Sequence, residues 1–403
     1  MPEAVIVSTA RSPIGRANKG SLVDLRPDDF AATIVAAALA KVPQLDPQTV
    51  EDLMIGCAQP AGEQGYNLGR VVAILAGLDD VPGTTVNRYC SSSLQTIRMA
   101  AHAIKCGEGD VFIAAGVECV SRYDKGRSDG NPGTTNDRFS DARSRSKARQ
   151  EAGAPTWTPG AGLPDVYIAM GQTAENVVQA EGVTREEMDE FAARSQQRAV
   201  QSQTNGFFER EITPVTLPDG TVVSKDDGPR DGTTTEKLAQ LKPVFRPDGT
   251  VTAGNACPLN DGAAAVIVMS DTRANELGIT PLARVVSSGV SGLNPEIMGL
   301  GPIGASRMAL TRAGLTMDDI DLVEINEAFA AQVIPSAKHL NIPIEKLNIH
   351  GGGIALGHPF GMTGARIMTT LLNGLEDGGG RYGLETMCVG GGQGMAMIVE
   401  RLT

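Results

Sequence analysis

Apolar positions in the first 121 residues alternate between short β-branched runs and longer Ala-rich stretches with one apolar face. Short apolar runs favour buried strands, whereas apolar residues spaced three or four apart favour amphipathic helices. Asp28 or Asp29 is expected to cap the first helix. Strands that alternate with helices predict an α/β domain with a largely parallel core sheet. The expected strands are 5–7, 53–56, 84–86 and 111–115, and the expected helices are 28–40 and 91–104.

The pattern changes between residues 122 and 165, where Gly, Pro, Ser, Asp and Arg dominate and the apolar periodicity is lost. Two interpretations stay open for this stretch: a solvated loop, or a lid or oligomer contact that also meets an anionic ligand. Helical patterns follow at 173–180 and 184–204, and residues 214–242 again resemble a loop. The basic cluster in the first of these stretches is Arg143, Arg145, Lys147 and Arg149.

The α/β alternation returns in the last third of the chain. In both halves a strand leads to a turn with a reactive residue, then to a helix, and then to a strand that ends in a Gly-rich turn. This similarity predicts an internal duplication. The expected strands are 263–269, 283–287, 322–325 and 395–400, and the expected helices are 305–313, 328–339 and 364–375.

Composition narrows the class of protein. A chain of 403 residues is expected to form two or more domains. The net charge of −12 argues against nucleic-acid binding, which needs a basic surface. None of the six cysteines forms a CxxC pair, so we expect free thiols in a reducing cytoplasm and neither a zinc ribbon nor a disulfide framework. No signal peptide or membrane-spanning run is apparent.

Two cysteines, a histidine and an asparagine stand where small residues and turns leave them accessible. Cys90 directly precedes a helical pattern, whose dipole is expected to stabilise a thiolate. His358 lies in a Gly-His-Pro-Phe-Gly turn and suits a base for that thiol. Cys388 precedes Gly390, where backbone N–H groups can hold a thioester oxygen. Asn326 follows a strand and can donate a hydrogen bond or orient a water. Together these residues suit acyl-transfer chemistry.

Each of these residues also has a structural interpretation. Cys90 can be a buried packing residue, Cys388 a plain strand end, and Asn326 a helix N-cap. The glycines at 351–357 match neither a P-loop nor a dinucleotide fingerprint. The remaining histidines and cysteines are interpreted as surface, structural or core residues: His102, His339, His350, Cys57, Cys106 and Cys119.

Four sequence blocks resemble the thiolase family over the whole chain. They are Asn87-Arg88-Tyr89-Cys90-Ser91-Ser92-Ser93-Leu94-Gln95, then Asn326-Glu327-Ala328-Phe329, then the turn around His358 with Thr363-Gly364-Ala365-Arg366, and last Cys388-Val389-Gly390-Gly391-Gly392. Their order and spacing follow the family pattern.

The resemblance implies a duplicated α/β fold with five αβαβα layers and an inserted loop domain. The implied domains are 1–121 with 250–274, the loop domain 122–249 that binds coenzyme A and makes oligomer contacts, and 275–403. It also implies an acetyl-CoA C-acyltransferase or 3-ketoacyl-CoA thiolase that works through an acyl-Cys90 intermediate. His358 would activate Cys90 and help hold the thioester oxygen, Cys388 would be the acid/base for the α-carbon, and Asn326 would position a water. The N–H groups of Cys90 and Gly390 would form the second oxyanion hole.

Positions that line the coenzyme A groove of thiolases correspond here to eight residues. Family members often carry Ser where Cys257 stands and His where Ala169 precedes Met170, and the loop 122–165 is longer and more polar here than in short-chain biosynthetic members. These departures favour a degradative or broad-range thiolase of fatty acid β-oxidation. The eight residues are Met170, Arg230, Phe245, Ala253, Cys257, Leu259, Met298 and Phe329.

Other functions stay open beside this one. A ketoacyl-synthase-like condensing enzyme does not use a second cysteine, so Cys388 argues against it. A non-catalytic lipid-binding homologue has no need of all four reactive residues. A Cys90–Cys388 disulfide for redox sensing is compatible with catalysis. We expect coenzyme A as a substrate, no permanently bound cofactor or metal, no nucleic acid or membrane insertion, a cytoplasmic location, and a homodimer or homotetramer.

Overall fold

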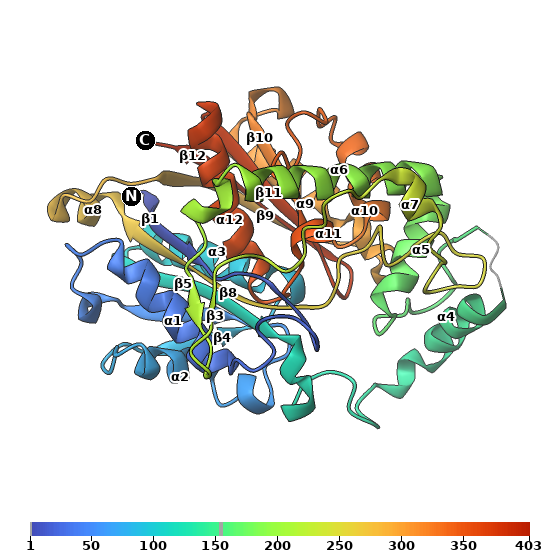
Figure 1. Cartoon of the computed structure of the whole chain (residues 1–403), viewed down its shortest axis with the longest axis horizontal. Helices are drawn as coiled ribbons and strands as arrows, with labels where there is room; N and C mark the ends of the chain where they lie inside the picture. Colours follow the sequence, from blue (N-terminus) through green and yellow to red (C-terminus); the bar gives the residue numbers. More distant parts are fainter. Residues whose placement is uncertain (1, 153–155) are drawn as a thin grey trace.

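The N-terminal strands form a mixed half-sheet in the computed structural model, which describes residues 2–152 and 156–403 (Figure 1). β3 pairs in parallel with β4 on one side and β5 on the other, while β8 pairs antiparallel with β5 and with β1. A short strand, β2, adds to the end of β8. The bounds are β1 Ala4–Arg11, β2 Gly15–Arg16, β3 Asp52–Gly56, β4 Gly83–Val86, β5 Val111–Cys119 and β8 Asn260–Ser270.

The C-terminal strands repeat this pairing. β10 pairs in parallel with β11, β11 antiparallel with β12, and β12 antiparallel with β9, as β3, β5, β8 and β1 do in the first half. The halves join where β1 pairs with β9 at Val5–Arg284 and Ile6–Ala283. The expected duplication is therefore visible in the topology. The bounds are β9 Ala283–Gly292, β10 Leu322–Ile325, β11 Tyr382–Val389 and β12 Gln393–Arg401.

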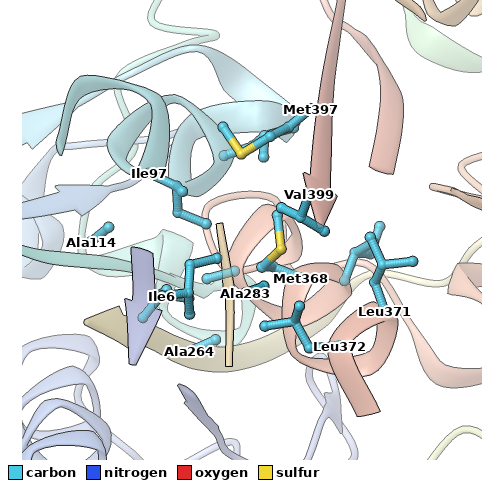
Figure 2. Packing of buried hydrophobic residues seen from close by; sticks show 14 of the residues in the cluster. Ile6, Ile97, Ala114, Ala264, Ala283, Met368, Leu371, Leu372, Met397 and Val399 are labelled. Carbon is cyan, nitrogen blue, oxygen red and sulfur yellow. The ribbon is translucent and has the colours of Figure 1, made fainter. Parts of the chain in front are cut away.

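Helices cover both outer faces and fill the space between the half-sheets. α1 and α2 pack on the outer face of the first, α9 and α10 on the outer face of the second, and α3 and α12 contact each other in the centre. Figure 2 shows this central layer, where Ile6 of β1 and Ile97 of α3 pack near Met368 of α12 and Val399 of β12. The predicted αβαβα order is confirmed. The bounds are α1 Pro27–Ala40, α2 Leu68–Leu75, α3 Ser92–Cys106, α8 Asp271–Leu277, α9 Gly301–Ala313, α10 Ala330–His339, α11 Gly353–Leu356 and α12 Thr363–Gly378.

The chain between β5 and β8 contains the remaining helices and a two-stranded hairpin. Residues 140–152 form α4, so the expectation that 122–165 lacks regular structure was wrong there. Its sequence has no apolar face, and Figure 1 shows α4 at the edge of the molecule, away from both sheets. A helix that buries no apolar face shows no apolar periodicity in its sequence, so α4 could not be predicted from that pattern. The bounds are α4 Ser140–Ala152, α5 Met170–Glu181, α6 Arg185–Thr204, α7 Thr235–Ala239, β6 Val215–Thr216 and β7 Val222–Val223.

Three smaller expectations also need correction. The N-cap of α1 is Arg26, and Asp28 lies inside the first turn. α10 begins at Ala330, so Asn326 is not its N-cap. Cys106 is exposed at the end of α3, whereas Cys57 and Cys119 are core residues as expected. No helix in the described ranges is both long and apolar enough to cross a bilayer.

Candidate active site

Cys90 sits in a tight turn between β4 and α3. Tyr89 has a φ of 43°, an uncommon backbone conformation for a residue with a side chain. Side-chain hydrogen bonds hold it, because the Asn87 Oδ1 accepts from Tyr89 N at 2.9 Å and the Ser92 hydroxyl donates to Tyr89 O at 2.6 Å. The Asn87 amide in turn donates to Ala58 O at 3.1 Å. The turn therefore places Cys90 at the start of α3, with its side chain buried.

His358 follows α11 and faces the first half of the chain. Its backbone N–H donates to Asn260 Oδ1 of β8 at 3.0 Å. A Cβ at Gly361 would lie 2.2 Å from Val117 O of β5, so only glycine allows this turn to approach β5 so closely. The turn thus joins the C-terminal half to the half that carries Cys90.

The hydrogen bonds of His358 define which ring nitrogen is basic. Its Nδ1 lies 2.6 Å from Thr363 Oγ1, and that hydroxyl donates its own proton to Pro359 O at 2.8 Å. Nδ1 must therefore carry a proton and donate to Thr363, which leaves the lone pair on Nε2. The Asn326 amide lies 3.2 Å from Nε2 and is its donor. Asn326 Oδ1 is buried and has no hydrogen-bond partner within the described ranges.

Three thiols from distant parts of the chain lie close enough to influence one another. Burial raises the pKa of both Cys388 and Cys257, and the negative charge of a Cys90 thiolate raises it further. A backbone hydrogen bond from Gly390 reaches the Cys90 sulfur. Cys388 is buried near the end of β11, opposite Gly394 of β12. The structure therefore brings Cys90 and the turn after Cys388 together.

Burial reverses the expected ionisation of Cys90. Burial raises the pKa of Cys90 to about 11, although hydrogen bonds from Gly390 and from its own backbone favour the thiolate. Burial also lowers the pKa of His358 to about 3. The expectation of a helix-stabilised thiolate was wrong, because desolvation of the buried sulfur outweighs the helix end. Both groups are neutral at rest at pH 7.

If His358 is the base for Cys90, as the sequence predicts, the acylation rate is expected not to change between pH 6 and pH 9. The pKa of His358 lies below this range and that of Cys90 above it, so neither group changes its charge within it. Proton transfer within a neutral pair neither takes up nor releases a proton. Stopped-flow acylation by acetyl-CoA would measure this profile. A rate that rises tenfold per pH unit through pH 8 would show instead that Cys90 reacts through a free thiolate.

A chamber of about 520 Å³ opens at Cys90. Tyr89, Gly390 and Gly391 line it beside the sulfur, and so does Phe360, whose ring centre lies 5.1 Å from that of His358. The rest of the wall comes from the loop domain and from the segment after β3. These residues are Ala58, Gln59, Ser128, Asp129, Gly130, Thr134, Thr135, Val166, Tyr167, Ile168 and Met170.

Five of the eight residues expected to bind coenzyme A belong to one apolar cluster. Met298 and Phe329 are buried in it, and Met170, Phe245 and Cys257 are partly buried against it. The Phe245 and Phe329 rings meet edge to face with centres 6.1 Å apart. Arg230, Ala253 and Leu259 are exposed. Arg230 is held by its backbone N–H, which donates to Gln196 of α6 at 2.8 Å.

Glu118 is a buried residue that no sequence motif singled out. Its carboxylate accepts from the backbone N–H groups of Ala58 at 2.8 Å and Gly361 at 3.0 Å. It also accepts from Gln64 at 2.9 Å and from the Tyr123 hydroxyl at 3.0 Å. Burial raises the pKa of Glu118, and these four donors oppose the rise. Glu118 thus ties the His358 turn to the segment that lines the chamber.

Glu118→Gln is expected to lower kcat by about tenfold to a hundredfold, the cost of misplacing a catalytic group by about 1 Å. An amide NH2 replaces one acceptor oxygen, which costs the bonds either to Gln64 and Tyr123 or to Ala58 and Gly361, so the tie between the chamber wall and the His358 turn is weakened. Steady-state kinetics and the melting temperature of the same samples would measure this. Glu63→Gln is the matched control, because Glu63 pairs with Arg122 in the neighbouring loop and does not contact the turn. A lower melting temperature with normal kcat would assign Glu118 to stability alone.

The comparisons with known proteins agree over the whole chain. Residues 4–272 match the model of the thiolase N-terminal domain, and residues 279–401 match that of the thiolase C-terminal domain. A beta-ketoadipyl-CoA thiolase of Acinetobacter baylyi is 44% identical and a 3-ketoacyl-CoA thiolase of Idiomarina loihiensis 43% identical, each over 100% of both chains. The structure of the dimeric peroxisomal thiolase of Saccharomyces cerevisiae matches with a TM-score of 0.89 and 34% identity, over 100% of this chain and 98% of that one.

The chain belongs to the thiolase family. It is therefore an acyltransferase that moves acyl groups between coenzyme A thioesters, by thiolysis of a 3-ketoacyl-CoA or by the reverse condensation. Coenzyme A is its substrate, and the family uses no permanently bound cofactor. Within the described ranges no cluster of three or more His, Cys, Asp or Glu residues could hold a metal ion.

Proposed function

We propose that Cys90 is the nucleophile that carries the acyl group. The observation that carries this proposal is that the Gly390 N–H reaches the Cys90 sulfur, and that Cys388 lies close enough for the Cys90 charge to act on it, although nearly 300 positions separate the two thiols in sequence. The sulfur lines the chamber, so a substrate can reach it. The N–H groups of Cys90 and Gly390 that stabilise a thiolate can also hold the oxygen of the thioester formed there.

In thiolysis, His358 takes the Cys90 proton on Nε2 while the sulfur attacks the 3-keto carbon of the substrate. The bond between the α- and β-carbons then breaks, and its electron pair leaves on the acetyl-CoA enolate. Cys388 gives the enolate carbon a proton. The Cys388 thiolate then takes the proton of a second coenzyme A thiol, whose sulfur attacks acyl-Cys90. The shortened acyl-CoA is released, and His358 returns its proton to the Cys90 sulfur. Condensation follows the same steps in reverse, with Cys388 as the base.

Asn326 and His358 supply the oxyanion site for the enolate. Asn326 donates one amide proton to His358 Nε2 at 3.2 Å, and its Oδ1 is free to accept from a water that points its other proton at the thioester oxygen. An enolate of a thioester is costly in water, and removing one donor of such a site typically costs about 3 kcal/mol.

The apolar cluster around Phe245 and Phe329 supports a coenzyme A groove. Met170 belongs to this cluster and also lines the chamber, so it lies between the groove and the Cys90 sulfur. Arg230 is exposed and can stack on the adenine or pair with a phosphate. The other groove residues are Ala253, Cys257, Leu259 and Met298.

The assembly and setting are inferred from the same features. β4 is the edge strand of the first half-sheet, and Tyr66 beside it is 94% exposed, which suits pairing with a second copy as a homodimer or homotetramer. The proposed domains are 1–121 with 250–274, the loop domain 122–249, and 275–403. We place the enzyme in the cytoplasm, in the degradation of fatty acids or other acyl chains. The relatives' printed names span 3-ketoacyl-CoA and beta-ketoadipyl-CoA thiolases.

Thiolysis of a series of 3-ketoacyl-CoA substrates tests the proposed function. With coenzyme A added, acetoacetyl-CoA is expected to give two molecules of acetyl-CoA, and longer chains are expected to react at least as fast because the chamber at Cys90 has room for them. The loss of the 3-ketoacyl-CoA absorbance measures the rate. If no member of the series is cleaved, the result favours the alternative of a non-catalytic lipid-binding homologue. Faster turnover of acetoacetyl-CoA than of every longer chain would contradict the degradative assignment.

A further inference from the structure

The chamber extends from Cys90 away from the coenzyme A groove. Of the eight residues proposed for that groove, only Met170 lines the chamber. The remaining wall belongs to the Cys90 turn, the segment after β3, Phe360, the glycines 390 and 391, and two stretches of the loop domain, 128–135 and 166–170. Because coenzyme A leaves Cys90 through the groove, the chamber is the space left for the acyl chain.

The chamber wall contains the hydroxyl of Thr135, which is hydrogen-bonded to an arginine outside the chamber. Arg143 of α4 donates from Nη1 to Thr135 Oγ1 at 2.7 Å. The Thr135 oxygen is thus an acceptor towards Arg143, and none of the described residues receives the Thr135 hydroxyl proton in a recorded hydrogen bond. A hydroxyl polarised by a guanidinium is a stronger donor than a free one. Thr135 can therefore donate to an acceptor inside the chamber.

Positive charge accumulates behind this wall. Arg143 and Lys147 line a second cavity of about 410 Å³, which shares Tyr167 and Ile168 with the chamber. No carboxylate among the described residues lies within ion-pair distance of Arg143, and Lys147 pairs only with Glu151, at 3.8 Å, where both side chains are exposed. Such an exposed pair contributes little. Arg143 is exposed to solvent and lies outside the chamber wall, and it can act on an anion in the chamber through its hydrogen bond to Thr135.

The acidic residues nearest to these cavities are held by other partners. Asp129 lines the chamber, but its carboxylate accepts from Gln59 at 2.9 Å and from the Tyr89 hydroxyl, next to Cys90. Asp165 lines the second cavity and accepts from the Tyr167 N–H at 3.0 Å. Asp129 therefore repels an anion near the sulfur, whereas Thr135 and Arg143 attract one at α4.

We propose that the chamber is a subsite for an acyl chain that ends in a carboxylate, which Thr135 and Arg143 recognise. This inference rests on the proposed function, in which Cys90 carries that chain. The chain places its 3-keto carbon at Cys90, passes Asp129 with methylene groups, and ends at the Thr135 hydroxyl. A methyl-ended chain of the same length leaves Thr135 and Arg143 without this acceptor.

The test compares kcat/KM for thiolysis of 3-oxoadipyl-CoA, its neutral methyl ester and 3-oxohexanoyl-CoA, which has the same six-carbon chain. The enzyme is expected to prefer 3-oxoadipyl-CoA over both neutral substrates by about tenfold to a hundredfold, the range for a charge-assisted hydrogen bond. Arg143→Gln and Thr135→Val are each expected to lower this ratio by about tenfold. Thr135→Ser keeps the hydroxyl and is expected to keep the ratio.

Arg145→Gln is the matched control, because Arg145 lies on the same helix but donates to Leu163 O and lines neither cavity. A ratio at or below one in the unchanged enzyme would overturn the inference, and so would equal losses for all three substrates in Arg143→Gln. Cleavage of acetoacetyl-CoA distinguishes a failure of the proposed subsite from a failure of the proposed function. If it is cleaved while 3-oxoadipyl-CoA is not preferred, only the subsite fails, and if nothing is cleaved, both proposals fail.

Discussion

Cys90→Ala is expected to lower thiolysis of acetoacetyl-CoA by about four orders of magnitude or more, the scale seen when an enzyme loses its nucleophile. Without the sulfur no acyl-enzyme forms, and coenzyme A would have to attack the 3-keto carbon directly in a site shaped for two separate steps. The side chain is small and lines a chamber, so its removal leaves the packing of α3 largely unchanged. Steady-state thiolysis and the melting temperature would be measured on the same preparation.

Cys106→Ala is the matched control for this variant. Cys106 is the exposed thiol at the other end of α3, so its loss removes a sulfur from the same helix without touching the site. It is expected to keep the wild-type rate. Residual thiolysis within tenfold of wild type in Cys90→Ala would remove Cys90 from the role of nucleophile.

Cys388→Ser is expected to separate the two halves of the reaction. Its steady-state thiolysis is expected to fall by about a thousandfold, within the range for loss of a general acid or base. The serine hydroxyl is a much weaker acid than the thiol, so it supplies the enolate proton poorly. Acylation of Cys90 by acetyl-CoA needs no proton at the α-carbon and is expected to stay within about tenfold of wild type. Single-turnover acetylation and steady-state thiolysis measure the two rates.

Cys119→Ser controls for the cost of exchanging a buried sulfur for oxygen. Cys119 is buried at the end of β5, as Cys388 is near the end of β11, but the main charges that act on its thiol are those of Asp261 and Glu118, whereas Cys90 acts on Cys388. Both rates are expected to stay near wild type, with a lower melting temperature. If Cys388→Ser lost acylation and thiolysis to the same extent, the division of labour between the two thiols would be wrong.

Many strands of the fold could be predicted from the sequence because they are buried on both faces. β10 spans the residues expected for it, Leu322–Ile325, and β1, β5 and β8 contain the runs expected as strands. Such strands are short apolar runs bounded by turn residues, which is the pattern that sequence shows best. The proposed site residues were selected for another reason. Glycine and proline turns around His358 and Gly390 place backbone near a substrate, and these turns stand out in a sequence.

The remaining features depend on contacts that no local pattern records. Glu118 lies in an apolar strand, and its importance comes from donors at Ala58, Gln64, Tyr123 and Gly361 that only the folded chain assembles. The shift in the pKa of Cys90 was predicted in the wrong direction, because a sequence shows where the helix starts but not how deeply the thiol is buried.

The loop domain was the least predictable part. α4 has charged residues on all sides, so its helical period carries no apolar signal. The pairing of Thr135 with Arg143 joins two polar segments that both resemble solvated loop in the sequence. The chamber arises only where these segments fold over the Cys90 turn.

Acid-quench mass spectrometry after mixing with acetyl-CoA tests the central claim most directly, because it shows which atom carries the acyl group. The wild-type enzyme and Cys388→Ser would each be quenched within the first turnover, digested and mapped. The account predicts one acetyl group per chain on the peptide that contains Cys90 in both proteins, and none in Cys90→Ala. Acetylation of the Cys388 peptide, or a wild-type enzyme that turns over without any acetylated Cys90, would contradict it.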